Sequence, residues 1–236
     1  MNVDKSGPRI RHMFGEIAPR YDLLNHLLSL GIDRWWRRRA VQLVPARDGT
    51  PVLDVCTGTG DLALAYWRST GGRVPIVGVD FCRPMLAIST EKASRAGAGS
   101  AVAWIEADAR QLPFPDDLFQ IVCVAFGLRN VSDTEAGLRE LVRVCRRGGN
   151  VAILEFTLPQ KQPWRTLYGW YLRHVLPRVG QTLAKNRQGA YNYLAASVGE
   201  FFQPEALAEL MRRSGLSRVC YHVFTLGIAA LYVGVK

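Results

Sequence analysis

The sequence predicts an α/β protein with a doubly wound, mostly parallel sheet. Between residues 51 and 156, short apolar segments alternate with amphipathic ones, and strands that are apolar throughout need helices on both faces of a parallel sheet. A glycine-rich turn, Gly58-Thr59-Gly60, follows the first of these strands. Near the C-terminus two apolar segments are joined only by residues 225–227, a link too short for a parallel crossover. The sheet should therefore end in an antiparallel strand pair.

The elements follow in order along the chain. Residues 10–45 carry apolar residues at helical spacing, with breaks at Pro19 and Gly31, and precede the first strand. Strands are expected at residues 51–55, 74–80, 102–106, 118–125, 150–156, 216–224 and 228–235. Helices are expected between them at residues 61–69, 84–95, 134–146 and 204–215, the last closed by a glycine C-cap.

Residues 159–200 interrupt this alternation. They are rich in tryptophan and tyrosine, are expected to be helical, and could form a lid over a site at the C-terminal ends of the strands. Together with the N-terminal helices, 1–45, they would decorate a single domain that spans residues 1–236. Neither an internal repeat nor a low-complexity segment divides the chain.

Composition limits the class of protein. The chain has 236 residues, is 48% hydrophobic, and shows neither a secretory signal nor an apolar stretch of membrane-spanning length. Its five cysteines form no C-x-x-C pair and its four histidines no ligand spacing, so we expect reduced thiols, a cytoplasmic location and no metal. The formal charge of +10 suits an anionic partner or a merely solvated surface, so charge alone decides nothing.

The glycine turn is the sharpest local signal. Gly58, Gly60 and Ala63 also satisfy the dinucleotide fingerprint, in which a pyrophosphate sits at the N-terminus of the following helix. Here Asp54 ends the strand and Asp61 opens that helix, and two carboxylates would repel a pyrophosphate. They favour a ligand with an ammonium and a sulfonium, as in S-adenosylmethionine (AdoMet).

Two further sites are expected to complete the cofactor pocket. Asp80 ends the second strand, where an acidic side chain can accept hydrogen bonds from both ribose hydroxyls. Asp108-Ala109 follows the third strand and is placed to contact the adenine edge. The predicted cofactor residues are Asp54, Gly58, Thr59, Gly60, Asp80, Asp108 and Ala109.

Longer motifs identify a family resemblance. The segments F-G-E-I-A-P-R-Y-D-L-L-N (14–25), L-S-L-G-I-D-R-W-W (28–36), L-P-F-P-D-D-L-F (112–119), F-G-L-R-N-V (126–131) and R-V-C-R-R-G-G (143–149) are similar to blocks of the UbiE/MenG-like family, which methylates quinone precursors. This family lies within the class I AdoMet methyltransferases, which are Rossmann-like. The similarity runs nearly end to end. Asp33, Thr57, Ala125 and Arg147 depart from it, where histidine, glycine, serine and proline are usual.

The resemblance implies an activity and a catalytic pair. It implies methyl transfer from AdoMet to a ring carbon of a polyprenylated quinol, with Arg129 and Asn130 facing the substrate. We expect them to hold and polarise a quinol oxygen, with Arg129 stabilising the developing phenolate. A water molecule or a nearby carboxylate would accept the proton. Demethylmenaquinol is the expected substrate, and a benzoquinol of the ubiquinone pathway is the alternative.

Other functions remain open but fit less well. AdoMet-dependent methylation of RNA or another small molecule is one, a catalytically idle binding module another, and an NAD-dependent dehydrogenase a third. No nucleic acid is expected as a partner. Methyltransferases that act on nucleic-acid amino groups favour an N/D-P-P-aromatic run after the fourth strand, and residues 125–128 lack it. Cys123 falls inside a strand, where packing is a better explanation than a role as the nucleophile of cytosine-C5 methylation.

The aromatic segment 164–193 and the N-terminal helices have two interpretations. They can simply pack as helices, or they can form an apolar entrance for the polyprenyl tail, with arginines resting on anionic lipid at the inner face of the membrane. The sequence leaves the oligomeric state open, including a homo-oligomer.

Overall fold

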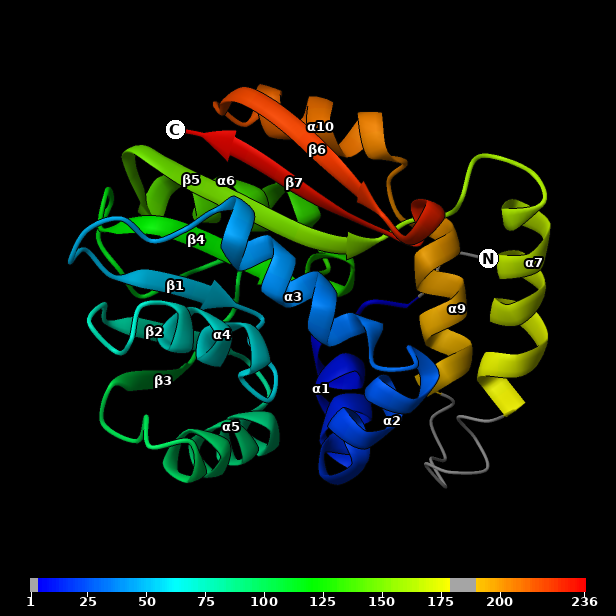
Figure 1. Ribbon diagram of the computed structural model, residues 1–236, viewed down its shortest axis with the longest axis horizontal. Coiled ribbons are helices and arrows are strands. Elements are labelled where there is room, and N and C mark those ends of the chain that lie inside the picture. Colours follow the sequence, from blue (N-terminus) through cyan, green and yellow to red (C-terminus); the bar gives the residue numbers. More distant parts are fainter. Residues whose placement is uncertain (1–3, 179–189) are drawn as a thin grey trace.

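The computed structural model describes residues 4–178 and 190–236. Within them, the strands form a seven-stranded sheet of order β3-β2-β1-β4-β5-β7-β6 (Figure 1). The strands are β1 (Val52–Val55), β2 (Ile76–Asp80), β3 (Val102–Glu106), β4 (Phe119–Ala125), β5 (Cys145–Phe156), β6 (Ser217–Phe224) and β7 (Ala229–Val235). Strands β1 to β5 pair in parallel, whereas β7 is antiparallel to both β5 and β6. The predicted mostly parallel sheet with an antiparallel C-terminal pair is confirmed.

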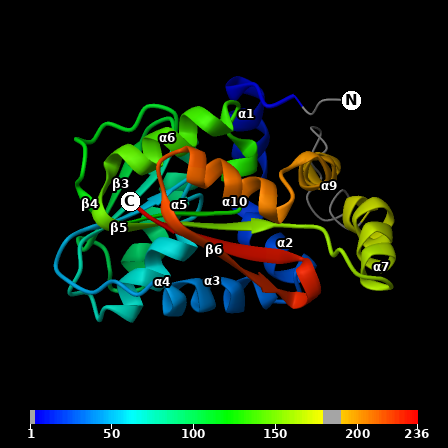
Figure 2. The ribbon, with the colours of Figure 1, turned by 90° about the horizontal axis from the view of Figure 1, so that it is seen from above.

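Helices cover both faces of the sheet. They are α1 (Gly7–Ile17), η1 (Ala18–Arg20), α2 (Tyr21–Leu28), α3 (Ile32–Leu43), α4 (Asp61–Ser69), α5 (Arg83–Arg95), η2 (Leu128–Asn130), α6 (Thr134–Val144), α7 (Trp164–Trp170), η3 (Tyr171–Val175), α9 (Ala190–Glu200), α10 (Pro204–Arg213) and η4 (Thr225–Gly227). One core joins α6 and α10 to the sheet, and another joins α3, α4 and α5 to it. Figure 2 shows α6 and α10 on one side of the strands and α3 and α4 on the other.

The start of β5 differs from the expectation. The strand begins at Cys145 rather than at residue 150, and α6 ends at Val144 rather than at residue 146. The register against β4 shifts between Phe119 and Ile121, and Gly148 takes a φ of 73°. Glycines usually signal a turn, and here they allow an irregular strand to continue. A Cβ on Gly149 would lie 2.8 Å from two backbone oxygens.

The two helical additions pack on each other. Ile10 and Met13 of α1 share a buried cluster with Leu172 of η3 and with Tyr193 of α9. Figure 1 shows α2, α7 and α9 beyond the C-terminal ends of the parallel strands. The helical character expected of residues 159–200 agrees with α7, η3 and α9, and residues 179–189 of that expectation lie outside the described residues. No helix in the described part of the chain combines the length and the apolar character that crossing a membrane needs.

Candidate active site

A cavity lies at the C-terminal ends of the central strands, next to the position where the strand order reverses between β1 and β4. Open α/β sheets bind their ligands at such a position. Gly58, Asp80, Asp108 and Ala109 line this strand-end cavity, and so does Asn130. Thus four of the predicted cofactor residues and one of the predicted catalytic pair come together there.

The glycine turn is shaped by positive backbone angles. Cys56, Gly58 and Gly60 have φ values of 54°, 56° and 82°. These values suit glycine and strain a residue with a side chain. At Gly60 space is also limiting, because a Cβ would lie 2.5 Å from the ring of Trp104. Gly60 therefore permits the turn to pack against β3, and it does not line the cavity.

Asp54 holds the turn from behind. Its carboxylate accepts hydrogen bonds from the Thr57 hydroxyl at 2.6 Å and from the Ala63 backbone N–H at 3.0 Å. Burial raises its pKa to about 7. Asp54 is 1% exposed and is not among the residues that line the cavity, so the structure places its carboxylate behind the turn.

The second acidic residue of the turn, Asp61, is already paired with cations of the protein. Asp61 lies 2.5 Å from the Lys92 ammonium and 3.8 Å from Arg37, so protein cations neutralise it. The Thr59 hydroxyl donates to Asp22 at 2.6 Å, and Thr59 is also absent from the cavity wall. The turn is therefore not a free acidic patch that repels a pyrophosphate.

Asp80 is the acidic group that does face the cavity. One carboxylate oxygen accepts the Gly58 N–H at 2.8 Å and the other accepts the Cys82 N–H at 2.9 Å. Each oxygen keeps a lone pair for a ligand hydroxyl. Burial raises the pKa of Asp80 to about 6, although these backbone hydrogen bonds oppose the shift. The carboxylate is thus mostly ionised at neutral pH and preset to accept two hydrogen bonds.

Asp108 has a different environment. Its side chain is 43% exposed and paired with the Arg110 guanidinium at 2.7 Å. Hydrogen bonds from Arg110 lower its pKa, so it is a charged but already occupied acceptor. Ala109 is buried and offers an apolar contact beside it.

A second cavity, of about 270 Å³, lies among the N-terminal helices, the insertion and the end of β5. Most of this helical cavity is lined by aromatic and aliphatic side chains, including Trp36, Phe156, Tyr168 and Tyr171. Phe14, Tyr21 and Phe126 line both cavities and so form a common wall. The two cavities are therefore neighbours that meet at aromatic side chains.

Arg129 and Asn130 are adjacent in η2 but line different cavities. Arg129 lines the helical cavity, 5% exposed, and its guanidinium lies 2.9 Å from the fully buried Glu155 carboxylate. Among the described residues, Arg129 Nε has no hydrogen-bond partner. Asn130 lines the strand-end cavity and accepts a hydrogen bond from the Tyr193 hydroxyl at 3.1 Å.

Tyr21 is a residue of this site that the sequence reasoning did not single out. It lies in the common wall, and burial raises the pKa of its hydroxyl, while the guanidiniums of Arg129 and Arg37 act against that rise. The hydroxyl therefore stays protonated at neutral pH and lies close to two positive charges. The Y-D-x-x-N block that contains it was the available signal.

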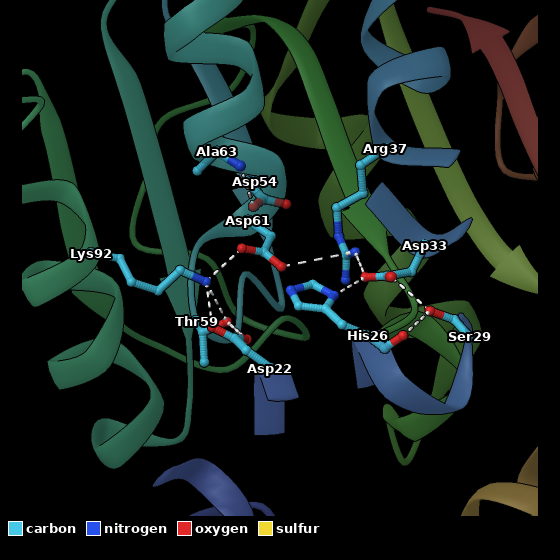
Figure 3. A network of polar contacts seen from close by, with 10 residues as sticks. All are labelled: Asp22, His26, Ser29, Asp33, Arg37, Asp54, Thr59, Asp61, Ala63 and Lys92. Atoms are coloured by element: carbon cyan, nitrogen blue, oxygen red, sulfur yellow. Dashed lines mark hydrogen bonds and ion pairs between the residues drawn. The ribbon is translucent and has the colours of Figure 1, made fainter. Parts of the chain in front are cut away.

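A polar network connects the N-terminal helices to the glycine turn (Figure 3). Lys92 of α5 lies 2.6 Å from Asp22 of α2 and also contacts Asp61 and Thr59 at the turn. Arg37 of α3 extends the network by its 2.5 Å contact with Asp33. The helices that line one cavity are thereby tied to the turn that shapes the other.

His26, Asp33 and Asp61 bring ligand-type atoms within 4.8 Å of one another. Asp33 accepts hydrogen bonds from Ser29 and Arg37, and lies 2.8 Å from the His26 ring. Arg37 pairs with Asp33 and Lys92 pairs with Asp61, so the arrangement is accounted for as an ion-pair network. Asp33, a departure from the family pattern, is integrated into it.

Comparisons with known proteins agree over the whole length. Residues 2–236 match the ubiE/COQ5 methyltransferase family. A demethylmenaquinone methyltransferase of Thermus thermophilus is 49% identical over 94% of this chain and 99% of its own. A ubiquinone/menaquinone biosynthesis C-methyltransferase UbiE of Geobacter sulfurreducens is 44% identical over 99% of this chain and 91% of its own.

Solved structures share the fold at low identity. A SAM-dependent methyltransferase of Thermotoga maritima, named a possible histamine N-methyltransferase, superposes with a TM-score of 0.66 at 19% identity, covering 95% of this chain and 99% of its own. The [4+2]-cyclase SpnF gives 0.71 at 16%, covering 96% and 94%. These superpositions confirm the class I methyltransferase fold. Because the two proteins have such different names, the reaction must be argued from the site. With the family matched from end to end, the chain belongs to the ubiE/COQ5 methyltransferase family.

Proposed function

We propose that this enzyme transfers a methyl group from AdoMet to a ring carbon of a polyprenylated quinol, converting demethylmenaquinol to menaquinol. The observation that carries the proposal is the common wall of Phe14, Tyr21 and Phe126. These three side chains line both cavities, so a cavity with a ribose-type acceptor adjoins an apolar cavity suited to a quinol ring. The name of the Thermus relative supports the same substrate.

The strand-end cavity fits AdoMet. Asp80 offers two carboxylate oxygens for the ribose hydroxyls, and Gly58 lets the backbone approach the methionine part. Asp108 and Ala109 would contact the adenine, with Phe81 and Val131 as further wall residues. Thr59, Gly60 and Asp54 would act indirectly, by shaping the turn. Bound AdoMet supplies an electrophilic methyl group.

The residues of the helical cavity would prepare the acceptor carbon. A quinol ring carbon becomes nucleophilic when a neighbouring hydroxyl loses its proton. We assign Arg129 to the developing phenolate, because its buried and unpartnered Nε–H needs an acceptor. The Tyr21 hydroxyl would position the ring at the common wall, and Asn130 would act from the strand-end cavity next to it.

Water would take the proton. Asp33 is the one carboxylate that lines the helical cavity among the described residues. Although burial opposes it, contact with Arg37 and hydrogen bonding hold its pKa below the usual value, which makes it a weak base. The aromatic walls exclude most other water and so protect the phenolate from rapid reprotonation.

The benzoquinol of ubiquinone synthesis is the second candidate, because the Geobacter relative is named for both pathways. Incubating the pure enzyme and AdoMet with demethyl-naphthoquinol and demethyl-benzoquinol in parallel distinguishes them. We expect turnover of the naphthoquinol with a higher kcat/KM. Turnover of neither would refute the proposed function.

Such substrates reside in a lipid bilayer. We therefore place the enzyme in the cytoplasm and, during turnover, at the inner surface of the membrane through its basic and aromatic helices. The metal-free mechanism and the absence of a nucleic-acid partner belong to the same proposal.

A further inference from the structure

Exposed apolar side chains gather in segments that also contribute Leu28, Tyr168 and Thr225 to the wall of the helical cavity. They come from three separate segments: the α2–α3 corner, α7 and η4. We call them the rim face and define it as Leu27, Leu30, Trp35, Trp164, Leu167, Trp170 and Leu226, all of which are exposed. A soluble protein normally scatters such residues, and a concentration of them marks an interaction site.

Hydrogen bonds connect the three segments through residues that line the helical cavity. The Tyr171 hydroxyl, just after α7, donates to the Leu28 carbonyl at 2.8 Å. The Trp36 indole of α3 donates to the Thr225 hydroxyl of η4 at 2.8 Å. Leu28, Tyr171 and Thr225 all line the helical cavity. In Figure 2, α7 and η4 lie on the same side of the molecule, beyond the end of β5.

Two of the rim leucines adopt an unusual backbone conformation. Leu30 and Leu226 have φ values of 53° and 59°, in the left-handed region where glycine or asparagine is favoured over leucine. They are also 84% and 59% exposed, so core packing does not explain them. Strained residues of this kind point to a function for the side chain they present.

The charge around the rim has one sign. Residues 23–39, 158–178 and 217–228 contain a single acidic residue, Asp33, and it is buried. The same segments carry many exposed bases, among them Arg34, Arg38, Arg165 and Arg173. A second copy of this face would be repelled by like charge, and a nucleic acid would not need the leucines.

We propose that the rim face docks the enzyme on a bilayer rich in anionic lipid, with the opening of the helical cavity against the membrane. The inference rests on the proposed function, since a polyprenylated quinol must pass from lipid to the ring site. Rim leucines and tryptophans enter the interfacial layer, and the arginines contact lipid phosphates. The tail can then stay in the bilayer while the ring reaches Arg129.

A vesicle-sedimentation experiment tests the docking. Wild type should bind vesicles of phosphatidylcholine containing one quarter phosphatidylglycerol at least tenfold more tightly than pure phosphatidylcholine vesicles. The double variant Leu167→Gln/Leu226→Asn should lose about tenfold in affinity for the anionic vesicles. Asparagine suits the left-handed backbone, so this variant should fold. Val223→Thr, an exposed β6 position outside the rim face, is the matched control and should bind as wild type does.

Charge and chemistry are separated in two further measurements. Arg34→Gln/Arg38→Gln should weaken anionic-vesicle binding and its salt dependence, whereas Arg139→Gln on α6 should not.

Turnover of a tail-less, water-soluble quinol should be unchanged in Leu167→Gln/Leu226→Asn. If the pure wild type turns over neither demethylquinol, the proposed function fails independently of docking. Unchanged vesicle binding by the double variants would overturn the docking proposal. So would a wild type that is a dimer in solution while the double variants are monomers, because the rim face would then be a contact between two copies.

Discussion

The two neighbouring cavities are built in different ways. The strand-end cavity rests on strand ends and a glycine turn, and its key acceptor, Asp80, is held by two backbone N–H groups. The helical cavity is assembled from segments distant in the sequence, with Tyr171 of the insertion bonded to Leu28 of the N-terminal region. Backbone geometry therefore fixes the cofactor site, while side-chain packing between helices fixes the substrate site.

The largest effect is expected from removing the Arg129 guanidinium. Arg129→Met alone would leave Glu155 charged and buried, a destabilisation of about 3–5 kcal/mol. The double variant Arg129→Met/Glu155→Gln avoids this and should fold. We expect kcat to fall about 100- to 1000-fold, as for the loss of an oxyanion donor. AdoMet affinity, measured by calorimetry, should change little. A folded double variant with near-normal turnover would remove Arg129 from the mechanism.

The next largest effect should fall on AdoMet binding and leave quinol binding nearly unchanged. Asp80→Asn puts an amide N–H against a backbone N–H and removes the charge from the ribose acceptor. Hydrogen bonds to charged groups contribute about 1.5–3 kcal/mol, so AdoMet affinity should fall about 10- to 100-fold. The KM for quinol should stay within about twofold. Asp108→Asn, at a half-exposed carboxylate paired with Arg110, is the matched control and should weaken AdoMet binding only slightly.

The pH dependence of AdoMet binding tests the same carboxylate. Burial raises the pKa of Asp80 to about 6, so affinity should be constant above that pH and fall up to about tenfold per unit below it. Because the folded pKa lies above the ordinary 3.8, the ligand-free fold gains stability from Asp80 as pH falls through this window. Weaker binding there would not reflect unfolding by this group. A flat calorimetric profile down to pH 5 would contradict the assignment.

Breaking the connection between the cavities should affect both moderately. Lys92→Met leaves Asp22 and Asp61 without their shared cation and detaches α2 from the glycine turn. We expect KM to rise several-fold for AdoMet and for quinol together, with partial recovery in Lys92→Arg. A change confined to one substrate would show that the network does not couple the two sites.

The smallest effect concerns the packing of the helical cavity. Tyr171→Phe removes one hydrogen bond, to the Leu28 carbonyl, and should lower the free energy of unfolding by about 0.5–1.5 kcal/mol. Turnover should change less than about twofold. A thermal melt indistinguishable from wild type would mean that this contact does not hold the insertion to α2.

The same contrast explains what the sequence could predict. Strands and the glycine turn were predictable because apolar runs and Gly58 carry local signals. Asp80 ends a strand and Asp108 follows one, and their place beside the cavity could be inferred from the parallel topology alone. The roles of Asp54 and Asp61 could not be predicted in this way. Local sequence does not reveal that the Asp54 carboxylate accepts a hydrogen bond from Thr57, or that the Asp61 carboxylate pairs with Lys92.

The helical cavity was less accessible to this reasoning. Arg129 was found through the family resemblance, but its pairing with Glu155 depends on β5 lying beside the η2 turn. Tyr21 was contained in a recognised block, yet its place in the common wall follows from how α2 packs against the end of the sheet. Such contacts between distant segments leave no periodic pattern in the sequence.

In the proposed reaction, the methyl group of AdoMet in the strand-end cavity passes directly to a ring carbon in the adjoining helical cavity, beside Phe14, Tyr21 and Phe126. The most direct measurement uses AdoMet labelled with carbon-13 in its methyl group, demethyl-naphthoquinol, and nuclear magnetic resonance of the product. We predict a labelled methyl resonance typical of attachment to a ring carbon. Label on a quinol oxygen, or none transferred while AdoMet binds tightly, would contradict the account.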